Sequence, residues 1–146
     1  MRERVMRSRF PVAVHLFFLH DDRVLLLRRF NTGWEDGKYS VPAGHVDAGE
    51  SVSAATIREA HEEVGVDLKT SDLEVVHVMH RKAEEERIDF FLIVKNWTGE
   101  ITNKEPHKCD DLAWHPLSSL PSNIIPYVRQ GLANYQSGIL FSEFGW

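Results

Sequence analysis

The chain has little cysteine, no long apolar run and no internal repeat, and each shortage excludes a class of protein. Its single cysteine, Cys109, cannot form a disulfide within the chain, which favours a reducing, cytoplasmic location. No apolar run is long enough to span a membrane. With no repeat, linker or low-complexity segment, the sequence is typical of one compact globular domain covering residues 1–146.

The charge of the chain limits its partners. The formal net charge is −5 at pH 7, which argues against a general binder of nucleic acid polymers or of anionic membranes. A polyphosphate substrate would also be repelled unless metal ions intervene. We therefore expect a small-molecule ligand and no polymer or membrane partner.

The two ends of the chain differ from the rest. Residues 1–9 form a short basic arm, and the apolar stretch 11–19 behind it imitates a secretory signal. The stretch is short and contains His15, and two acids follow where a cleavage site should lie, so we expect a first strand instead. The aromatic tail, residues 139–146, is expected to pack on the body of the protein or on a partner subunit, which leaves a homodimer open.

Hydrophobic patterning predicts a mixed α/β (α+β) fold. Helical periodicity appears in two segments, 51–64 and 124–135, and polar residues mark loops at 31–38 and 103–111. Strand-like patterns cover 12–19, 23–29, 73–82, 87–97 and 112–117. This order of strands and helices implies a mixed sheet between helices.

The helix predicted at 51–64 carries three acids on one face. Glu59, Glu62 and Glu63 are related by i, i+3 and i+4, so their Cβ atoms lie roughly 5–6 Å apart. Like charges at that spacing destabilise a bare helix, whereas a divalent cation would neutralise them. A solvated acidic face is the alternative interpretation of such a helix.

The glycines and charges around this helix resemble a known motif. The stretch reads Gly44, five residues, Glu50, seven residues, then Arg58-Glu59-Ala60-x-Glu62-Glu63-x-Gly65-Val66. It resembles the Nudix box, GX5EX7REUXEEXGU, with every fixed position filled and with alanine where the family usually has a larger aliphatic residue. The resemblance implies the α/β/α sandwich of this family and hydrolysis of a nucleoside diphosphate linked to another moiety.

The resemblance also implies a role for each matching position. Glu59, Glu62 and Glu63 would bind Mg²⁺, or Mn²⁺ as a substitute, together with the backbone carbonyl of Gly44. Arg58 would hold the glutamates in place, and Glu50 would act as a supporting acid outside the helix face. The catalytic set would thus include Glu59, Glu62 and Arg58. The general base would come from the box or a distal loop, where Glu105 is our candidate, with Asp110 and Asp111 behind it.

The substrate is the least defined part of the prediction. Trp34 and Tyr39 are candidates for stacking on a base, with structural packing as the alternative. Our first expectation is a nucleoside triphosphate, normal or oxidised, cleaved to a monophosphate and pyrophosphate. The alternatives are a nucleotide-sugar (ADP-ribose-like) pyrophosphatase and a Nudix-like module that binds a nucleotide without turnover.

Overall fold

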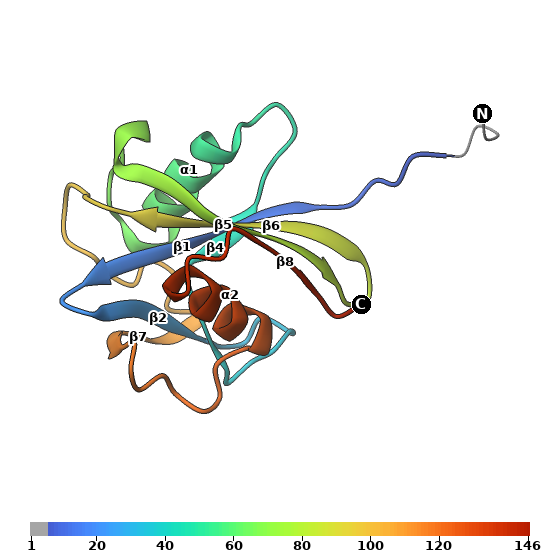
Figure 1. Cartoon of the computed structure of the whole chain (residues 1–146). Coiled ribbons are helices and arrows are strands. Elements are labelled where there is room, and N and C mark those ends of the chain that lie inside the picture. The colour runs from blue at the N-terminus through green and yellow to red at the C-terminus, as the bar shows by residue number, and fades with distance from the viewer. Residues whose placement is uncertain (1–5) are drawn as a thin grey trace.

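A computed structural model describes residues 6–146, which form two helices, one short 3₁₀ turn and eight strands (Figure 1). The helices are α1 (Val52–Val64) and α2 (Pro126–Gln136), and the 3₁₀ turn is η1 (Thr70–Asp72). The strands are β1 (Val12–His20), β2 (Arg23–Arg29), β3 (Tyr39–Ser40), β4 (Ala43–His45), β5 (Leu73–Lys82), β6 (Glu86–Val94), β7 (Cys109–Pro116) and β8 (Phe141–Phe144).

The strands form one mixed sheet with helices on opposite sides. The strand order is β3-β2-β1-β6-β5-β8, while β4 pairs with β1 and β7 pairs with β2. Two pairs are parallel, β1 with β6 and β5 with β8, and the others are antiparallel. Figure 1 shows α1 and α2 on either side of the central strands. The predicted α/β/α sandwich is confirmed.

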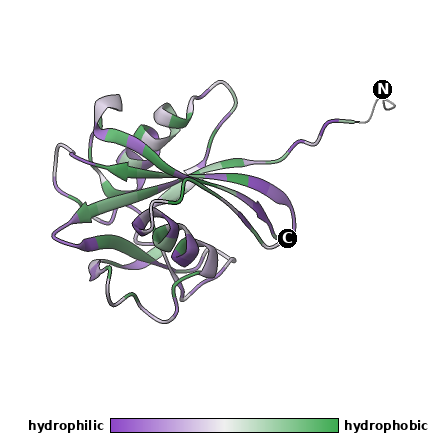
Figure 2. Cartoon of the chain, viewed as in Figure 1, coloured by the Kyte–Doolittle hydropathy of each residue, from purple (hydrophilic) through white to green (hydrophobic). Residues whose placement is uncertain are grey.

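Strand β1 explains why the core has two halves. Its side chains alternate between the faces of the sheet, and both faces are buried. Leu16 and Phe18 pack in the cluster that contains residues of α1, and Phe17 packs in the cluster that contains residues of α2. Hydrophobic residues are accordingly concentrated along the central strands (Figure 2).

Helix α1 begins and ends where the sequence predicts. The Ser51 hydroxyl accepts a hydrogen bond from the Ala54 amide at 3.0 Å, and Gly65 adopts the left-handed conformation with φ of 72°. Helical periodicity predicts that Ile57, Ala60 and Val64 form an apolar stripe with Ala54 at its edge, and this edge needs one correction. Ala54 is exposed, and Thr56 is buried instead, with its hydroxyl donating to the Val52 carbonyl at 2.8 Å.

Other element boundaries also differ from the prediction. Strand β7 starts at Cys109, inside the predicted loop 103–111, because its first residue pairs with Arg29 beyond an irregularity in β2. Helix α2 starts at Pro126, which suits a first helical position since proline has no amide to donate. The sequence did not predict β3, β4 and β8, which are too short to show a period.

The tail packs on the body of the protein. Strand β8 pairs with β5, the buried His77 ring contacts the Ile139 carbonyl at 2.7 Å, and the Trp146 indole donates to the His80 carbonyl at 3.0 Å. Residues 1–5 of the predicted basic arm lie outside the described residues, and residues 6–11 contain no helix or strand. No helix within 6–146 combines the length and apolar character needed to cross a membrane.

A buried histidine links β1 to α2. His15 lies 3.0 Å from the Tyr127 hydroxyl and 3.4 Å from the Phe90 carbonyl, and its ring stacks on Phe91. Burial lowers the pKa of His15 to about 4, although the nearby Asp89 carboxylate partly opposes this shift. His15 is therefore neutral in the folded protein at neutral pH.

Replacing His15 with Gln tests this burial. The ordinary histidine pKa of 6.5 exceeds the folded value of about 4, so the unfolded chain binds the proton first as the pH falls. As the pH falls from 6.5 to about 4, His15 should lower the free energy of unfolding by about 1.4 kcal/mol for each pH unit. Urea unfolding as a function of pH should show a smaller decrease for His15→Gln. The exposed His107→Gln is the control, and equal slopes for all three proteins would contradict the assignment.

Candidate active site

Arg58 organises the start of the acidic face. Its guanidinium donates to both carboxylate oxygens of Glu50, at 2.7 and 2.9 Å, and to the His45 carbonyl at 2.9 Å. It also donates to Glu59 at 2.8 Å and to Glu62 at 3.3 Å. The Arg58 hydrogen bonds are the main reason that the pKa of Glu50 falls to about 2. One arginine thus fixes the β4–α1 loop and two acids of the helix, consistent with the positioning role predicted for it.

Glu63 connects the helix to β4. Its carboxylate accepts a hydrogen bond from the Ala43 amide at 2.9 Å. Burial raises the pKa of Glu63 well above its usual range, and the negative charges of Glu59 and Glu105 raise it further. A cation at this position would stabilise the ionised carboxylate.

Glu59 lies directly against the backbone of Gly44. A Cβ atom added at Gly44 would overlap the Glu59 carboxylate, so any other residue there would displace this carboxylate from its present position. Glu59 is largely buried, with a side chain 12% exposed, whereas the Glu62 side chain is 53% exposed. Burial raises the pKa of Glu59, and Arg58 partly offsets the effect. Glu62 is thus the most accessible of the three acids.

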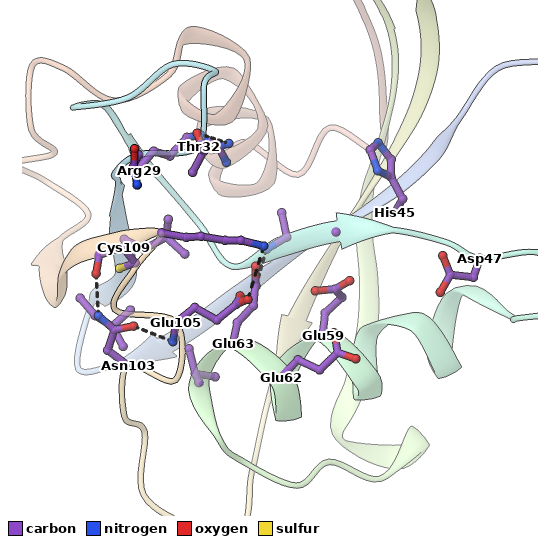
Figure 3. Close-up of a pocket in the computed structure, with 17 residues that line it drawn as sticks. Arg29, Thr32, His45, Asp47, Glu59, Glu62, Glu63, Asn103, Glu105 and Cys109 are labelled. Carbon is purple, nitrogen blue, oxygen red and sulfur yellow. Dashed lines mark hydrogen bonds and ion pairs between the residues drawn. The ribbon is translucent and has the colours of Figure 1, made fainter.

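The loop that precedes β7 adds a fourth acid. Asn103 shapes this loop by accepting from the Glu105 amide at 3.0 Å and donating to the Cys109 carbonyl at 2.8 Å. The Glu105 carboxylate then lies near Glu63, with Lys108 at 3.8 Å from it (Figure 3). The loop brings Glu105, 42 positions after Glu63 in the chain, to the acidic face of α1.

The two other acidic candidates, Asp110 and Asp111, lie in β7 and have different partners. Asp110 pairs with Arg28 at 2.7 Å, and Asp111 accepts from the Tyr39 hydroxyl at 2.6 Å. Neither lines a cavity with the box glutamates. Of the three acids proposed as general base from the sequence, only Glu105 lines the acidic face of α1.

A cavity of about 630 Å³ separates α1 from this loop. Figure 3 shows Glu59 and Glu63 extending from α1 toward β4 with Glu62 beside them, and Arg29 and Thr32 across the cavity. Five acids line it, and two cations oppose them; the acids are Asp47, Glu59, Glu62, Glu63 and Glu105, and the cations are Arg29 and Lys108. We call it the acidic cavity. The sequence alone did not identify Asn103, Lys108, Arg29 and Asp47, because no motif links them to the box.

The acidic cavity suits a hydrated divalent ion better than a closed metal cage. Within residues 6–146, no three His, Cys, Asp or Glu side chains already converge closely enough to enclose a metal ion. Mg²⁺ retains several waters and shares its coordination with substrate phosphates, so it needs only one or two carboxylates. The partly buried, mutually repelling glutamates supply the hard oxygen donors that such an ion prefers.

A second cavity, of about 880 Å³, adjoins the first along β4. The two cavities share Arg29 and the three residues of β4, Ala43, Gly44 and His45. Trp34 lines the second cavity with a side chain that is 46% exposed, and the Arg29 guanidinium lies 4.8 Å from the centre of its ring. A ligand could therefore extend from one cavity into the other.

Tyr39 does not line either cavity. It is buried in the core cluster next to α2, its ring meets His115 edge-on, and its hydroxyl is bound by Asp111. Its pairing in β3 with β2 places it there. The structural-packing alternative describes Tyr39, so stacking on a substrate remains a prediction for Trp34 alone.

Comparison with known proteins identifies the family of the chain. The family model for the NUDIX domain matches residues 9–135. The uncharacterized Nudix hydrolase YvcI of Bacillus subtilis is 30% identical over 137 residues, covering 85% of this chain and 79% of YvcI. The NAD-capped RNA hydrolase NudC of Pseudomonas aeruginosa is 35% identical over 100 residues, covering 68% of this chain but only 34% of NudC. The chain therefore matches about a third of that relative's length.

A solved structure agrees with this assignment. The MutT NUDIX hydrolase from Burkholderia pseudomallei superposes with a TM-score of 0.79 at 26% sequence identity, covering 86% of this chain and 98% of that one. The region that the family model matches contains the complete box, from Gly44 to Val66, and the β4 strand between the two cavities. The chain belongs to the Nudix family of pyrophosphohydrolases.

Proposed function

We propose that the chain hydrolyses nucleoside triphosphates, normal or oxidised, to a nucleoside monophosphate and pyrophosphate. The observation that carries the proposal is the acidic cavity, where the box glutamates and Glu105 face one another beside a second cavity for the rest of the nucleotide. In the reaction, water forms a bond to phosphorus, the phosphoanhydride bond breaks, and pyrophosphate leaves with the bonding electrons.

Glu59, Glu62 and Glu63, with the Gly44 carbonyl, would hold Mg²⁺ or Mn²⁺. When bound, such an ion screens the phosphate oxygens and lowers the pKa of a water molecule that it binds. Arg58 keeps Glu59 and Glu62 oriented through its two hydrogen bonds to them. Arg29 and Lys108, the cations of the acidic cavity, bind phosphate oxygens of the substrate.

Glu105 is the proposed general base. Its carboxylate lines the acidic cavity from a loop rather than from the metal-binding helix, so it is free to accept the proton of the attacking water. Trp34 is the proposed stacking surface for the base, since its ring is half exposed at the second cavity.

A nucleotide panel tests the proposed function. With Mg²⁺, triphosphates should give monophosphate and pyrophosphate, as resolved by ion-exchange chromatography, and a chelator should stop the reaction until Mg²⁺ or Mn²⁺ is restored. If ADP-ribose, UDP-glucose or NAD is cleaved in preference to triphosphates, the proposed substrate is wrong and a different class of diphosphate compound takes its place. Full turnover in excess chelator would contradict the metal-dependent mechanism, and the absence of turnover across the panel would favour a binding module.

Glu62→Gln should reduce kcat by about 100-fold or more, because it removes a charge that the proposed metal site needs. The substitution should leave the unfolding temperature nearly unchanged, because Glu62 is the most exposed of the box glutamates. The matched control is Glu74→Gln, an exposed change in β5 that lines neither cavity. A Glu62→Gln protein with the parent rate would refute the assigned role.

Glu105→Gln should lower kcat by about 10²–10⁴-fold, the range typical for loss of a general base, with a smaller effect on KM. Asp110→Asn is the control, since this acid of β7 pairs with Arg28 outside the acidic cavity. Steady-state kinetics at saturating Mg²⁺ measures both variants. Equal losses in the two variants would point to a distorted loop rather than to a missing base.

A further inference from the structure

The floor of the second cavity holds an arginine with an unused donor group. Arg81 is 5% exposed, its Nε donates to Asp89 at 2.6 Å, and its guanidinium carbon lies 3.6 Å from the centre of the Tyr127 ring. Its Nη2 is buried and has no hydrogen-bond partner within the described part of the chain. A buried donor without a partner is costly, and the Oδ1 of Asp89 is likewise buried without one. Because Arg81 also lines the second cavity, a ligand acceptor that reaches its guanidinium would complete its hydrogen bonding.

The surroundings of Arg81 balance its charge. The buried Asp89 neutralises it, and burial holds His15 and Tyr127 in their neutral forms, with pKa values of about 4 and about 12. The rim of the cavity is also mixed, with three cations and three acids: Arg29, Lys38, Arg87, Glu35, Glu84 and Glu85. A cavity without excess positive charge gives little advantage to a second phosphate group, and it favours a neutral polar group.

The chemistry of the Arg81 guanidinium further restricts which neutral polar group of a ligand can bind there. Arginine has only donors, so its partner must be an acceptor such as a carbonyl oxygen. An amino group in the same place is also a donor, so neither it nor the arginine N–H would gain a hydrogen bond. The Asp89 hydrogen bond and the Tyr127 ring hold the guanidinium in one orientation. The exposed Trp34 ring lines the same cavity and can cover the face of a flat heterocycle.

We propose that Arg81 binds the carbonyl oxygen of a nucleobase, so that the protein prefers 6-oxopurine and 4-oxopyrimidine nucleotides over their 6-amino and 4-amino counterparts. The inference rests on the proposed function, because it assumes that the phosphates occupy the acidic cavity across Gly44 while the base enters the second cavity. Arg81 is then a specificity-determining residue that contacts the substrate away from the reacting phosphorus.

Matched nucleotide pairs test the preference in the unmodified protein. Inosine and adenosine nucleotides differ at the 6-oxo or 6-amino group, and uridine and cytidine nucleotides differ at the 4-oxo or 4-amino group. Calorimetric titration with the 5′-monophosphates, which have no phosphoanhydride bond to cleave, should show Kd values about tenfold lower for the oxo member of each pair. The same ratio should appear in kcat/KM for the triphosphates, mainly through KM.

Two variants connect the preference to Arg81. Arg81→Lys keeps a positive charge beside Asp89 but loses the planar fork, and the double change Arg81→Leu with Asp89→Leu removes the buried pair together. The double change removes every donor and should bring the oxo-to-amino ratio close to one, whereas Arg81→Lys still has only donors and should lower the ratio without abolishing it. Arg23→Lys, an exposed change in β2, is the matched control and should retain the preference. Thermal unfolding verifies that each variant is folded.

The outcomes separate this inference from the proposed function. Equal Kd values within each nucleotide pair overturn the role of Arg81, even if both triphosphates are hydrolysed and even if neither variant folds. A preference that persists at full size in the folded double variant also overturns it. If no triphosphate is hydrolysed but the monophosphate preference is present and is lost in the folded double variant, the role of Arg81 stands and the proposed hydrolysis fails.

Discussion

The site depends on the close approach of strand β4 to helix α1. Gly44 has no side chain, so the Glu59 carboxylate can lie against the strand backbone, and one residue earlier the Ala43 amide donates to Glu63. Since β4 also pairs with β1, this contact fixes the acidic face of the helix to the centre of the sheet. The arginine network around Arg58 fixes the preceding loop to the same helix turn.

The two cavities on either side of β4 have different electrostatic character. The acidic cavity collects carboxylates whose mutual repulsion and burial disfavour their ionised forms, which is the condition that a divalent ion relieves. The second cavity balances its charges in pairs, with Arg81 and Asp89 as the buried example. One cavity is thus suited to phosphates with their metal ion, and the other to an uncharged organic group.

The sequence predicted the parts of the site that depend on local geometry. Helical spacing brings Glu59, Glu62 and Glu63 together regardless of the rest of the fold, and Ser51 and Gly65 define the helix ends through contacts within a few residues. The alternation of β1 likewise follows from its own pattern of buried residues.

The parts that were missed depend on contacts between distant segments. The amide of Ala43 and the pairing of Arg81 with Asp89 exist only once β4, β5 and β6 are assembled, and short strands show no period in the sequence. The burial of Tyr39 likewise follows from the pairing of two-residue β3 with β2. Glu105 was recognisable as an acid in a polar loop, but the Asn103 hydrogen bonds and the start of β7 at Cys109 distinguish its position from that of Asp110.

Strand β4, which lines both cavities, lies between the proposed sites of the base and of the phosphates. In the proposed binding mode, a nucleotide that fills both cavities passes the residues of β4 that they share, so the distance from the base sets which phosphoanhydride bond lies in the acidic cavity. In this binding mode, groups attached beyond that bond extend past the acidic cavity and contact neither cavity. In the proposed binding mode, the protein therefore discriminates between substrates mainly by the base and less by the group beyond the cleaved bond.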